Sequence, residues 1–318
     1  MTANDIAEAL GRHLRIMVTS HVNPDGDSIS SQLALASLLR AKGKQVQIID
    51  QDPVPERYRF LPGWQGISND LKVPNVTAVC VVDCANALRL GRVADLITPA
   101  TMDLMVIDHH ISNDGFGQAQ YIDPEASSTC ELVFRLAQRM ECRLTAEQAT
   151  ILLSGIMTDS GGFRYSNVSP ATLRTAAQLT EAGADLSWVS EQLYFQQPLR
   201  HLRVLGRLFS ELRLAGDGRI SWAVLTQQLA REHGFDINDS EEFVSQVLSV
   251  KGAEVGLLFK EQGNGIIRVS FRSKGRVDVN RLAALFGGGG HIQAAGARVK
   301  GTAEEVAQMV VAAVEKEL

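Results

Sequence analysis

Acidic and histidine residues recur at four places in the sequence, and each place follows an apolar run. These residues are His21, Asp25 and Asp27, then Asp83, then Asp108, His109 and His110, and then Asp159. Hard divalent ions prefer carboxylate oxygens, and imidazole nitrogens shift the preference toward Mn, Fe, Co or Zn. One such Asp alone is most often a helix cap or a turn residue. Four clusters with the same placement predict the ligand set of a divalent metal centre.

The residue types in these clusters indicate which metal chemistry they support. A mixture of carboxylates and histidines fits Mn²⁺ or a similar ion, with Mg²⁺ and Co²⁺ as alternatives, and a set without Cys argues against a closed structural zinc site. In Asp25-Gly26-Asp27 the glycine permits a tight turn, so the two carboxylates can face adjacent ions. Two ions roughly 3.5–4 Å apart clamp the attacking and leaving oxygens of a phosphoryl displacement and lower the pKa of a bridging water. The clusters therefore predict hydrolysis at phosphorus.

The elements that position the clusters alternate between strands and helices. Apolar runs predict strands at 14–20, 46–50, 78–83 and 104–108. Runs of this kind suit a parallel sheet that is buried on both faces, and residues 28–42 between them have helical periodicity. Ligands of such sheets bind beyond the carboxyl ends of the strands, where His21, Asp83 and Asp108 would lie. We expect an α/β domain with a mainly parallel five-stranded sheet flanked by helices.

A domain boundary is predicted near a Gln-Gln-Pro segment, after helices that include 145–157 and a loop that carries Asp159. The predicted parts are a catalytic domain at 1–195, a linker at 196–207 and a smaller α/β domain with a mixed sheet at 208–318. Strands are expected in the second domain at 220–225, 255–260 and 266–272, with a hairpin turn at 262–265. Thr302 and Glu305 form a capping box that opens a last helix. We expect the active-site cleft to lie between the domains.

Composition narrows the class of protein. A chain of 318 residues with 45% apolar and 21% charged residues is typical of a globular protein, and no stretch reaches the roughly 18 apolar residues of a membrane span. Residues 1–15 contain no apolar signal core, and the four cysteines have no CxxC spacing, so we expect free thiols and a cytoplasmic location. The net charge of -5 argues against a uniformly basic duplex-binding surface. Residues 250–300 nevertheless carry nine Lys and Arg against three Asp and Glu, so this segment either meets an anion or is a solvated surface.

The sequence resembles the DHH phosphoesterase superfamily, which is named for the triplet Asp108-His109-His110. Its other N-terminal motifs match His21-x-x-Pro24-Asp25-Gly26-Asp27, Asp83 and Asp159. The segment Gly287-Gly288-Gly289-Gly290-His291, followed by Ala294-Ala295-Gly296, resembles the signature of the DHH-associated C-terminal domain. Within the superfamily the similarity is to the NrnA type, bifunctional oligoribonucleases and 3'-phosphoadenosine-5'-phosphate (PAP) phosphatases. RecJ-type exonucleases are typically longer, and family II pyrophosphatases lack the glycine-histidine signature.

This resemblance implies roles at the matching positions. His21, Asp25 and Asp83 would hold one metal ion, and Asp27, Asp83, His109 and Asp159 would hold the other, with Asp83 bridging. His110 would lie near the scissile phosphate, where it would stabilise charge or protonate the leaving group. Asp108 would orient the histidines.

Substrate binding is expected to involve residues of both domains. These are Arg272, His291, Gly288, Gly289, Gly290 and Asn280 in the second domain and Arg164 in the first. The glycines could let a ligand approach closely and turn their N–H groups toward an anion, or form only a flexible turn. Arg272 could form a bidentate pair of hydrogen bonds to a phosphate or stack on a base. Arg164 could reach the substrate or be an exposed structural residue.

The resemblance implies an Mn²⁺-dependent phosphodiesterase that cuts very short single-stranded RNA or DNA to mononucleotides and removes the 3'-phosphate from PAP. Hydrolysis of cyclic or linear dinucleotides and RecJ-like single-strand exonuclease action are alternatives. A nucleotide-binding module without catalysis is the non-enzymatic alternative. The sequence leaves open whether the protein forms a homodimer.

Overall fold

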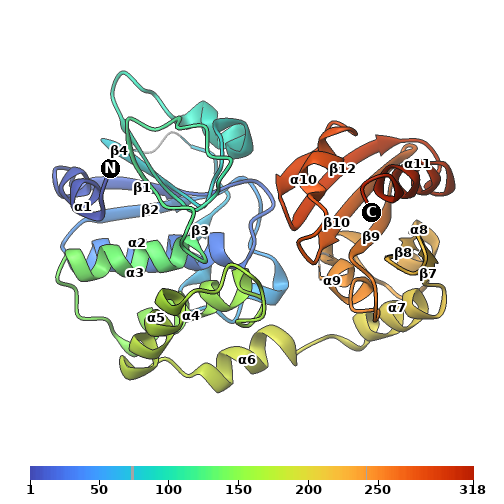
Figure 1. The fold of residues 1–318 in the computed structure, drawn as a ribbon. Helices are drawn as coiled ribbons and strands as arrows, with labels where there is room; N and C mark the ends of the chain where they lie inside the picture. The colour runs from blue at the N-terminus through green and yellow to red at the C-terminus, as the bar shows by residue number, and fades with distance from the viewer. Residues whose placement is uncertain (73–74, 241) are drawn as a thin grey trace. The chain divides into compact units, whose positions relative to one another are not determined.

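The computed structural model describes residues 1–72, 75–240 and 242–318, and the chain divides into two compact units. The first unit is Met1–Gln196 and the second is Gln197–Leu318 (Figure 1). Each unit contains one six-stranded sheet with helices packed against it. The predicted α/β class, with a larger N-terminal and a smaller C-terminal part, is confirmed.

The sheet of the first unit has the strand order β3-β2-β1-β4-β5-β6, and every neighbouring pair is parallel. The strands are β1 Arg15–Thr19, β2 Gln45–Ile49, β3 Ile67–Ser68, β4 Ala78–Val82, β5 Asp103–Asp108 and β6 Ala119–Ile122. The sheet therefore has six strands where five were expected. The two strands without a predicted range, β3 and β6, lie at the edges of the sheet and contain no long apolar run, which is why periodicity did not indicate them.

Helices cover both faces of this sheet. They are α1 Ala3–Gly11, α2 Gly26–Ala41, α3 Thr129–Arg139, α4 Ala146–Asp159, α5 Pro170–Glu181 and α6 Leu186–Tyr194, with the 3-10 helices η1 Glu56–Tyr58, η2 Trp64–Gly66 and η3 Ala87–Leu96. In Figure 1, α2, α3 and α4 lie on one side of the strands, where α2 contacts both other helices. Leu90 and Val93 of η3 pack on the opposite face. Because α2 is enclosed by the sheet and two helices, nearly all of its residues are buried.

The sheet of the second unit has the order β11-β12-β10-β9-β8-β7. The strands are β7 Arg213–Ala215, β8 Ile220–Leu225, β9 Val255–Gly263, β10 Ile266–Ser273, β11 Gly289–His291 and β12 Ala294–Lys300. Only β8 and β9 pair in parallel, so the predicted mixed sheet is confirmed, as is the hairpin between β9 and β10. The helices are α7 Leu199–Ser210, α8 Gln227–Glu232, η4 Ile237–Ser240, α9 Phe243–Val247, α10 Val279–Ala284 and α11 Ala303–Glu315. The capping box at Thr302 is present at the start of α11.

The segment expected to be a linker differs from that expectation. Most of it lies in α7, whose Val204 and Leu208 are fully buried against Ala223 and Leu225 of β8. The apolar residues of α7 repeat at helical spacing, so the segment gains more by packing on the second sheet than it would as an extended connection. The division between the units falls before Pro198, which precedes the first residue of α7.

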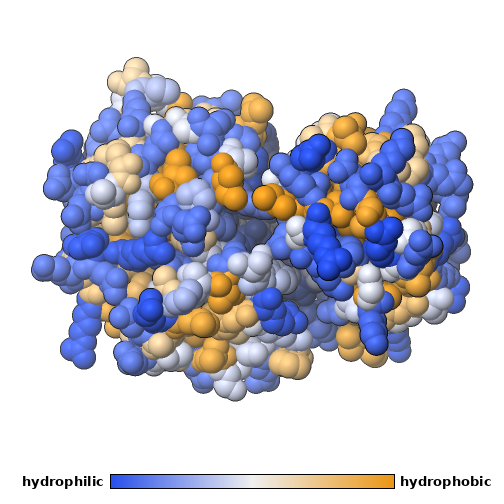
Figure 2. Space-filling view, in the orientation of Figure 1, coloured by the Kyte–Doolittle hydropathy of each residue, from blue (hydrophilic) through white to orange (hydrophobic). Residues whose placement is uncertain are grey.

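The outer surface is mainly hydrophilic on the face shown in Figure 2, with apolar residues in small groups. All four cysteines are free thiols, as predicted. Among the described residues, no helix has the length and apolar character needed to cross a membrane.

Candidate metal centre

Three of the four clusters meet at the carboxyl edge of the first sheet. The strands β1, β4 and β5 are neighbours, and their ends precede or contain His21, Asp83 and Asp108 respectively. Asp83 has a φ of 55°, in the left-handed region that non-glycine residues rarely adopt. Asp tolerates this conformation better than most residues. The backbone therefore turns immediately after β4, and such strained residues are concentrated at functional sites.

The carboxylate of Asp83 lies between two histidines. Its Oδ2 is 3.7 Å from Nε2 of His21, and its Oδ1 is 3.6 Å from Nε2 of His109. The same His21 nitrogen is 3.8 Å from Oδ2 of Asp25, which also caps the first turn of α2. Ligand atoms of His21, Asp25 and Asp83 thus form one compact group. A carboxylate with one oxygen toward each of two nitrogen donors has the arrangement of a bridging ligand.

A second compact group contains Asp27, His109 and Asp159. Nε2 of His109 is 3.1 Å from Oδ2 of Asp159. Asp159 is the last residue of α4, whereas the sequence analysis predicts it in a loop. It is thus delivered by a helix end, whereas Asp83 and Asp108 are delivered by strand ends.

The position of Asp27 depends on α3, a helix that the sequence reasoning missed. Both carboxylate oxygens of Asp27 accept backbone N–H groups in the first turn of this helix, from Thr129 at 2.6 Å and from Cys130 at 3.0 Å. The positive end of a helix dipole favours an anion there. The pattern Ser128-x-x-Glu131, in which Ser128 caps the helix, is the signal that would have found it.

In two histidines the Nδ1 atom is held by a hydrogen bond to a backbone carbonyl. Nδ1 of His21 is 2.8 Å from the carbonyl oxygen of Val22, and Nδ1 of His109 is 3.3 Å from that of Ala126. A carbonyl accepts, so Nδ1 carries the proton in each ring. In the neutral tautomer Nε2 then presents a lone pair to the carboxylate cluster, as a metal ligand must.

Asp108 lies behind the histidines rather than among the carboxylates. Its Oδ1 is 2.7 Å from Nδ1 of His110 and also accepts the backbone N–H of His109 at 2.9 Å. The second oxygen accepts from the Asn113 amide at 2.6 Å, a contact that the sequence did not indicate. Asp108 is fully buried and so fixes the ring of His110. Nδ1 of His110 is also 3.7 Å from Oδ1 of Asp83, and ligand atoms of Asp83, His109 and His110 form a third compact group.

The electrostatics of the cluster favour bound positive charge. Burial raises the pKa of Asp27, and the nearby charges of Asp83 and Asp159 raise it further. Burial acts to lower the pKa of His21, but its contacts with Asp25 and Asp83 outweigh burial and raise this pKa to about 10. His109 behaves in the same way, with Asp159 as the main cause of the raised pKa. Protons on the histidines thus take the place of cations among crowded carboxylates, and this donor set fits divalent ions.

A buried carboxylate that the sequence reasoning missed lies behind His21. Asp50 accepts the backbone N–H of Ser20 at 3.2 Å and the Gln32 amide at 2.9 Å. Burial raises the pKa of Asp50 to about 6. By binding the residue before His21, Asp50 fixes the end of β1. Its place directly after the apolar run of β2 was a usable signal.

Family models match both units of the chain. The DHH family N-terminal domain matches residues 15–156, and the DHHA1 domain matches residues 222–318. A protein of Thermus thermophilus named bifunctional oligoribonuclease and PAP phosphatase NrnA is 34% identical over 305 residues, with 95% of this chain and 90% of that protein covered. The chain belongs to the DHH family.

Other DHH relatives agree with this assignment. A Bacillus subtilis protein with the same name is 29% identical, with 89% of each chain covered. A crystal structure of an exopolyphosphatase-related protein from Bacteroides fragilis has a TM-score of 0.91 and 29% identity, with 99% of this chain and 96% of that chain covered. The predicted family resemblance is confirmed. Because the DHH match ends at residue 156, the place of Asp159 in the site rests on its contact with His109.

In the DHHA1 unit the sheet register brings two predicted residues to one row. Arg272 of β10 is opposite Ala294 of β12, which is opposite His291 of β11. Directly paired residues lie on the same face of a sheet, so Arg272 and His291 flank Ala294 on one face. Nη1 of Arg272 donates to the Phe271 carbonyl at 3.0 Å, and both predicted residues are half-buried.

The glycine run of DHHA1 has a different role from the anion nest that the sequence suggested. The N–H groups of Gly287, Gly288 and Gly290 already donate to the carbonyls of 284 and 283 and to the Asn280 side chain. A Cβ on Gly288 would lie 2.1 Å from the carbonyl oxygen of Gly296. The nest expectation is therefore wrong for these three amides. Gly288 and Gly290 lie too close to the backbone of β12 for a Cβ, whereas a Cβ on Gly289 would meet no atom closer than 3.7 Å. The Asn280 side chain fixes Gly290 by accepting its N–H.

Arg164 is held locally within the DHH unit. Its Nε donates to the Gly161 carbonyl, and its guanidinium lies 5.7 Å from the centre of the Tyr194 ring. The side chain is exposed. These contacts support the structural alternative for Arg164, and its role at the substrate stays a prediction.

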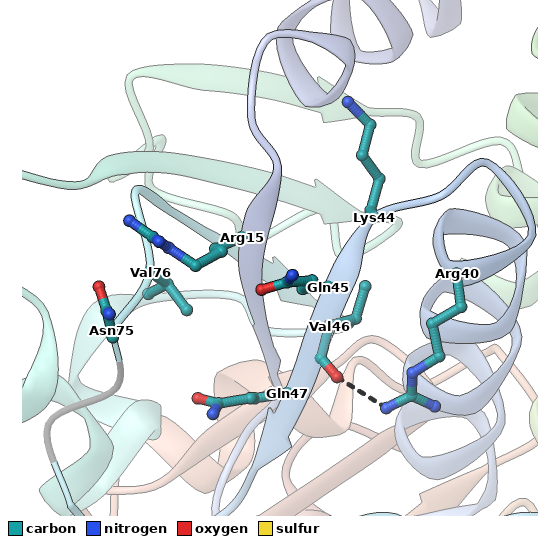
Figure 3. A pocket seen from close by; sticks show the side chains of 8 residues that line it. All are labelled: Arg15, Arg40, Lys44, Gln45, Val46, Gln47, Asn75 and Val76. Carbon is teal, nitrogen blue, oxygen red and sulfur yellow. Dashed lines mark hydrogen bonds between the residues drawn. The ribbon is translucent and has the colours of Figure 1, made fainter.

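A basic hollow lies at the opposite edge of the DHH sheet (Figure 3). It has a volume of about 300 Å³ and is lined at the beginnings of β1 and β2 by Arg15, Lys44 and Gln45. Arg40 also lines it and donates to the Val46 carbonyl at 2.8 Å. None of its described lining residues is a carboxylate, so this hollow does not have the donors of a divalent metal site.

Proposed function

We propose that the protein is an Mn²⁺-dependent phosphodiesterase that cuts very short oligonucleotides to mononucleotides, and that it also removes the 3'-phosphate from PAP. The observation that carries this proposal is the Asp83 carboxylate between His21 and His109, with a further carboxylate beside each histidine. Relatives named bifunctional oligoribonuclease and PAP phosphatase, of which 90% and 89% are covered, support the choice of substrate.

We assign the metal ligands from this geometry together with the roles that the family motifs imply, which leave His110 outside the ligand set. His21, Asp25 and Asp83 would hold one divalent ion, and Asp27, Asp83, His109 and Asp159 would hold the other. When bound, two such ions would polarise the phosphoryl group and lower the pKa of a bound water. The protein contributes fixed positions of the site's side chains, because the carboxylates of Asp27 and Asp108 already accept hydrogen bonds from backbone or side-chain donors.

His110 has a role distinct from the ligands in this proposal. Asp108 accepts from its Nδ1, which fixes the ring and leaves Nε2 as the nitrogen that faces the substrate. At that position His110 would donate a hydrogen bond to the scissile phosphate or a proton to the leaving oxygen. General acid catalysis of this kind contributes about 10²–10⁴-fold to a rate.

Substrate recognition is assigned to the DHHA1 unit. Arg272 and His291 lie on one face of its sheet and would bind a terminal phosphate and its nucleotide. Gly288, Gly289 and Gly290 would keep the backbone beside them free of side chains, with Asn280 as their support. The same face would hold PAP, which also carries two phosphates on one nucleoside. Free thiols support a cytoplasmic location, where single-stranded RNA and DNA fragments and nucleoside bisphosphates would be the substrates.

The test is a hydrolysis assay with Mn²⁺ on end-labelled RNA of graded length, beside PAP and a cyclic dinucleotide. We expect the highest kcat/KM on the shortest strands, measurable release of phosphate from PAP, and loss of both activities in Asp83→Asn. Asn tolerates the left-handed backbone at residue 83, and Asp95→Asn removes an exposed carboxylate as the matched control. Preference for the longest strands would instead indicate RecJ-like action, and binding without turnover would indicate a nucleotide-binding module.

A further inference from the structure

The first residue of α3 contacts two carboxylates of the candidate metal centre. The backbone N–H of Thr129 donates to Oδ2 of Asp27 at 2.6 Å, and its hydroxyl donates to Oδ1 of Asp83 at 3.1 Å. The two carboxylates come from different elements, since Asp27 lies in α2 and Asp83 follows β4. Thr129 therefore connects two ligands that the chain delivers separately.

The hydroxyl of Thr129 is not needed to build α3. Ser128 caps this helix, and its side chain accepts the backbone N–H of Glu131. The Glu131 carboxylate accepts in turn from Ser127 and from the Thr172 hydroxyl, so a separate network holds the start of the helix. Thr129 is fully buried, and a buried hydroxyl costs free energy unless it is hydrogen-bonded. An apolar side chain of the same shape would avoid this cost, so the fold alone does not require a hydroxyl at residue 129.

The direction of the hydrogen bond between Thr129 and Asp83 follows from the chemistry of the two groups. A hydroxyl can donate or accept, whereas an ionised carboxylate, the form that binds a metal, can only accept. Within the described part of the chain, Oδ1 of Asp83 is the only hydrogen-bond partner of this hydroxyl. The single hydroxyl hydrogen of Thr129 is therefore directed at a metal ligand.

The oxygen that Thr129 contacts is the one on the side of the second assigned site. Oδ1 of Asp83 is 3.6 Å from Nε2 of His109, which is assigned to the second ion. Oδ2 is 3.7 Å from Nε2 of His21, which is assigned to the first ion. Asp27, which accepts the N–H of Thr129, is also assigned to the second ion. Both contacts of Thr129 thus act on ligands of the same site.

The helix α4 encloses this region from another side. A Cβ on Gly155 of α4 would lie 2.9 Å from Oδ1 of Asp27, so the helix can approach the carboxylate only because residue 155 is glycine. Thr129, Asp27 and Asp83 are all buried, with exposed fractions of 0%, 0% and 2%. Bulk water therefore cannot replace a donor that is lost at Asp83, and the loss carries the full cost of an unmade hydrogen bond.

We propose that Thr129 is a positioning residue for the second metal site, because its hydroxyl fixes Oδ1 of Asp83 relative to the carboxylate of Asp27. The inference rests on the proposed function in taking divalent ions as the ligands of the centre. Partners that hydrogen-bond to metal ligands fix the orientation of those ligands, and their loss typically costs about 10–100-fold in metal affinity or activity. Because both contacts of Thr129 act on one site, loss of the hydroxyl should weaken the binding of one ion selectively.

Titration of the metal-free Thr129→Val variant with Mn²⁺ tests this role without turnover. The substitution keeps the branched shape and the backbone N–H of residue 129 and removes only the hydroxyl. By calorimetry we expect one ion to bind within a few fold of the wild type and the other to bind about 10–100-fold more weakly. Electron paramagnetic resonance gives a spectroscopic readout, because two Mn²⁺ ions that share a carboxylate are magnetically coupled. The coupled signal should require a higher Mn²⁺ concentration in the variant than in the wild type.

Matched variants separate positioning of the ligands from packing. Thr129→Ser keeps the hydroxyl, and we expect it to bind both ions within a few fold of the wild type. Thr172→Val removes another fully buried hydroxyl, which donates to the Glu131 carboxylate at 3.0 Å outside the assigned ligand set. We expect Thr172→Val to lower the Tm without changing the affinity for either ion. Adding Thr129→Val to Asp159→Asn, which lacks a ligand of the second site, should leave the affinity for the remaining ion unchanged.

Several outcomes would overturn the positioning role. They are undiminished affinity for both ions in Thr129→Val, an equal loss for the two ions, or the same selective loss in Thr172→Val. A loss in Thr129→Val that Thr129→Ser does not recover would assign Thr129 a role in packing alone. Failure of the wild type to bind a second Mn²⁺ ion would contradict the metal assignment of the proposed function. Two ions in the wild type without a selective loss in Thr129→Val would contradict only the inference about Thr129.

Discussion

Two regions of the molecule are built in opposite ways. One is the acid-histidine centre of the DHH unit, and the other is the basic face of the DHHA1 unit, which is the sheet face that carries Arg272 and His291. In the centre, Asp27, Asp83 and Asp108 are almost completely buried, and backbone or side-chain donors fix their oxygens. On the basic face, Arg272 and His291 are half-buried and are placed mainly by strand register. Chemistry at phosphorus requires positions fixed within fractions of an ångström, whereas binding strands of different length requires access. The difference supports our proposal that the DHH unit carries the reaction and the DHHA1 unit carries recognition of the substrate.

The largest effect that sharpens this comparison is expected at His110. We expect His110→Gln to lower kcat by about 10²–10⁴-fold with little change in KM, because the loss falls on the reacting phosphate and not on binding. Steady-state hydrolysis of a dinucleotide measures this split. Mn²⁺ affinity, measured in parallel by calorimetry, should stay within a few fold of the wild type. A large loss of Mn²⁺ affinity would instead make His110 a metal ligand.

A smaller effect on stability is expected in the glycine run. Gly288→Ala places a Cβ 2.1 Å from a backbone oxygen and 2.7 Å from the Ala297 Cα, so the strands must separate. We expect a loss of about 1–3 kcal/mol in the free energy of unfolding of the DHHA1 unit, measured by denaturant titration. Gly289→Ala is the matched control, because its nearest atom would be 3.7 Å away. Equal stability of the two variants would remove close strand approach as the reason for glycine at 288.

The smallest effect concerns Asp50, behind the metal centre. Burial raises its folded-state pKa from 3.8 to about 6, so the folded protein binds the proton more tightly than the unfolded chain does. The stability that this group contributes is therefore present below pH 3.8 and is lost as the pH rises through 6. Between pH 5 and 7 the metal-free wild type should lose about 1 kcal/mol relative to Asp50→Asn. Denaturant titrations at each pH measure the free energy of unfolding. A difference in this free energy between the two proteins that stays constant from pH 5 to 7 would contradict the prediction.

The sequence predicted the parts of the site that depend on strand ends. His21, Asp83 and Asp108 follow apolar runs, and parallel strands necessarily bring such positions to one edge. Asp159 could be assigned by its motif, but its delivery by a helix end depends on where α4 stops, and helix ends are the least certain feature of a periodic pattern.

Other features depend on contacts between distant segments, which periodicity does not contain. The N–H groups that hold Asp27 come from residues about a hundred positions away in the chain. For the glycine run the sequence left an anion nest and a flexible turn open, and only the pairing of β11 with β12 shows the close packing that the structure has instead. The row of Arg272, Ala294 and His291 likewise exists only through the register of β10, β12 and β11.

Calorimetric titration of the metal-free protein with Mn²⁺ tests the central claim most directly, that Asp83 joins two metal sites. We predict two Mn²⁺ ions per chain for the wild type and for Asp95→Asn. For Asp83→Asn we predict that binding of both ions weakens by at least tenfold, because the substitution removes an oxygen charge that the two sites share. A single ion per chain in the wild type, or two ions bound with undiminished affinity in Asp83→Asn, would contradict the account.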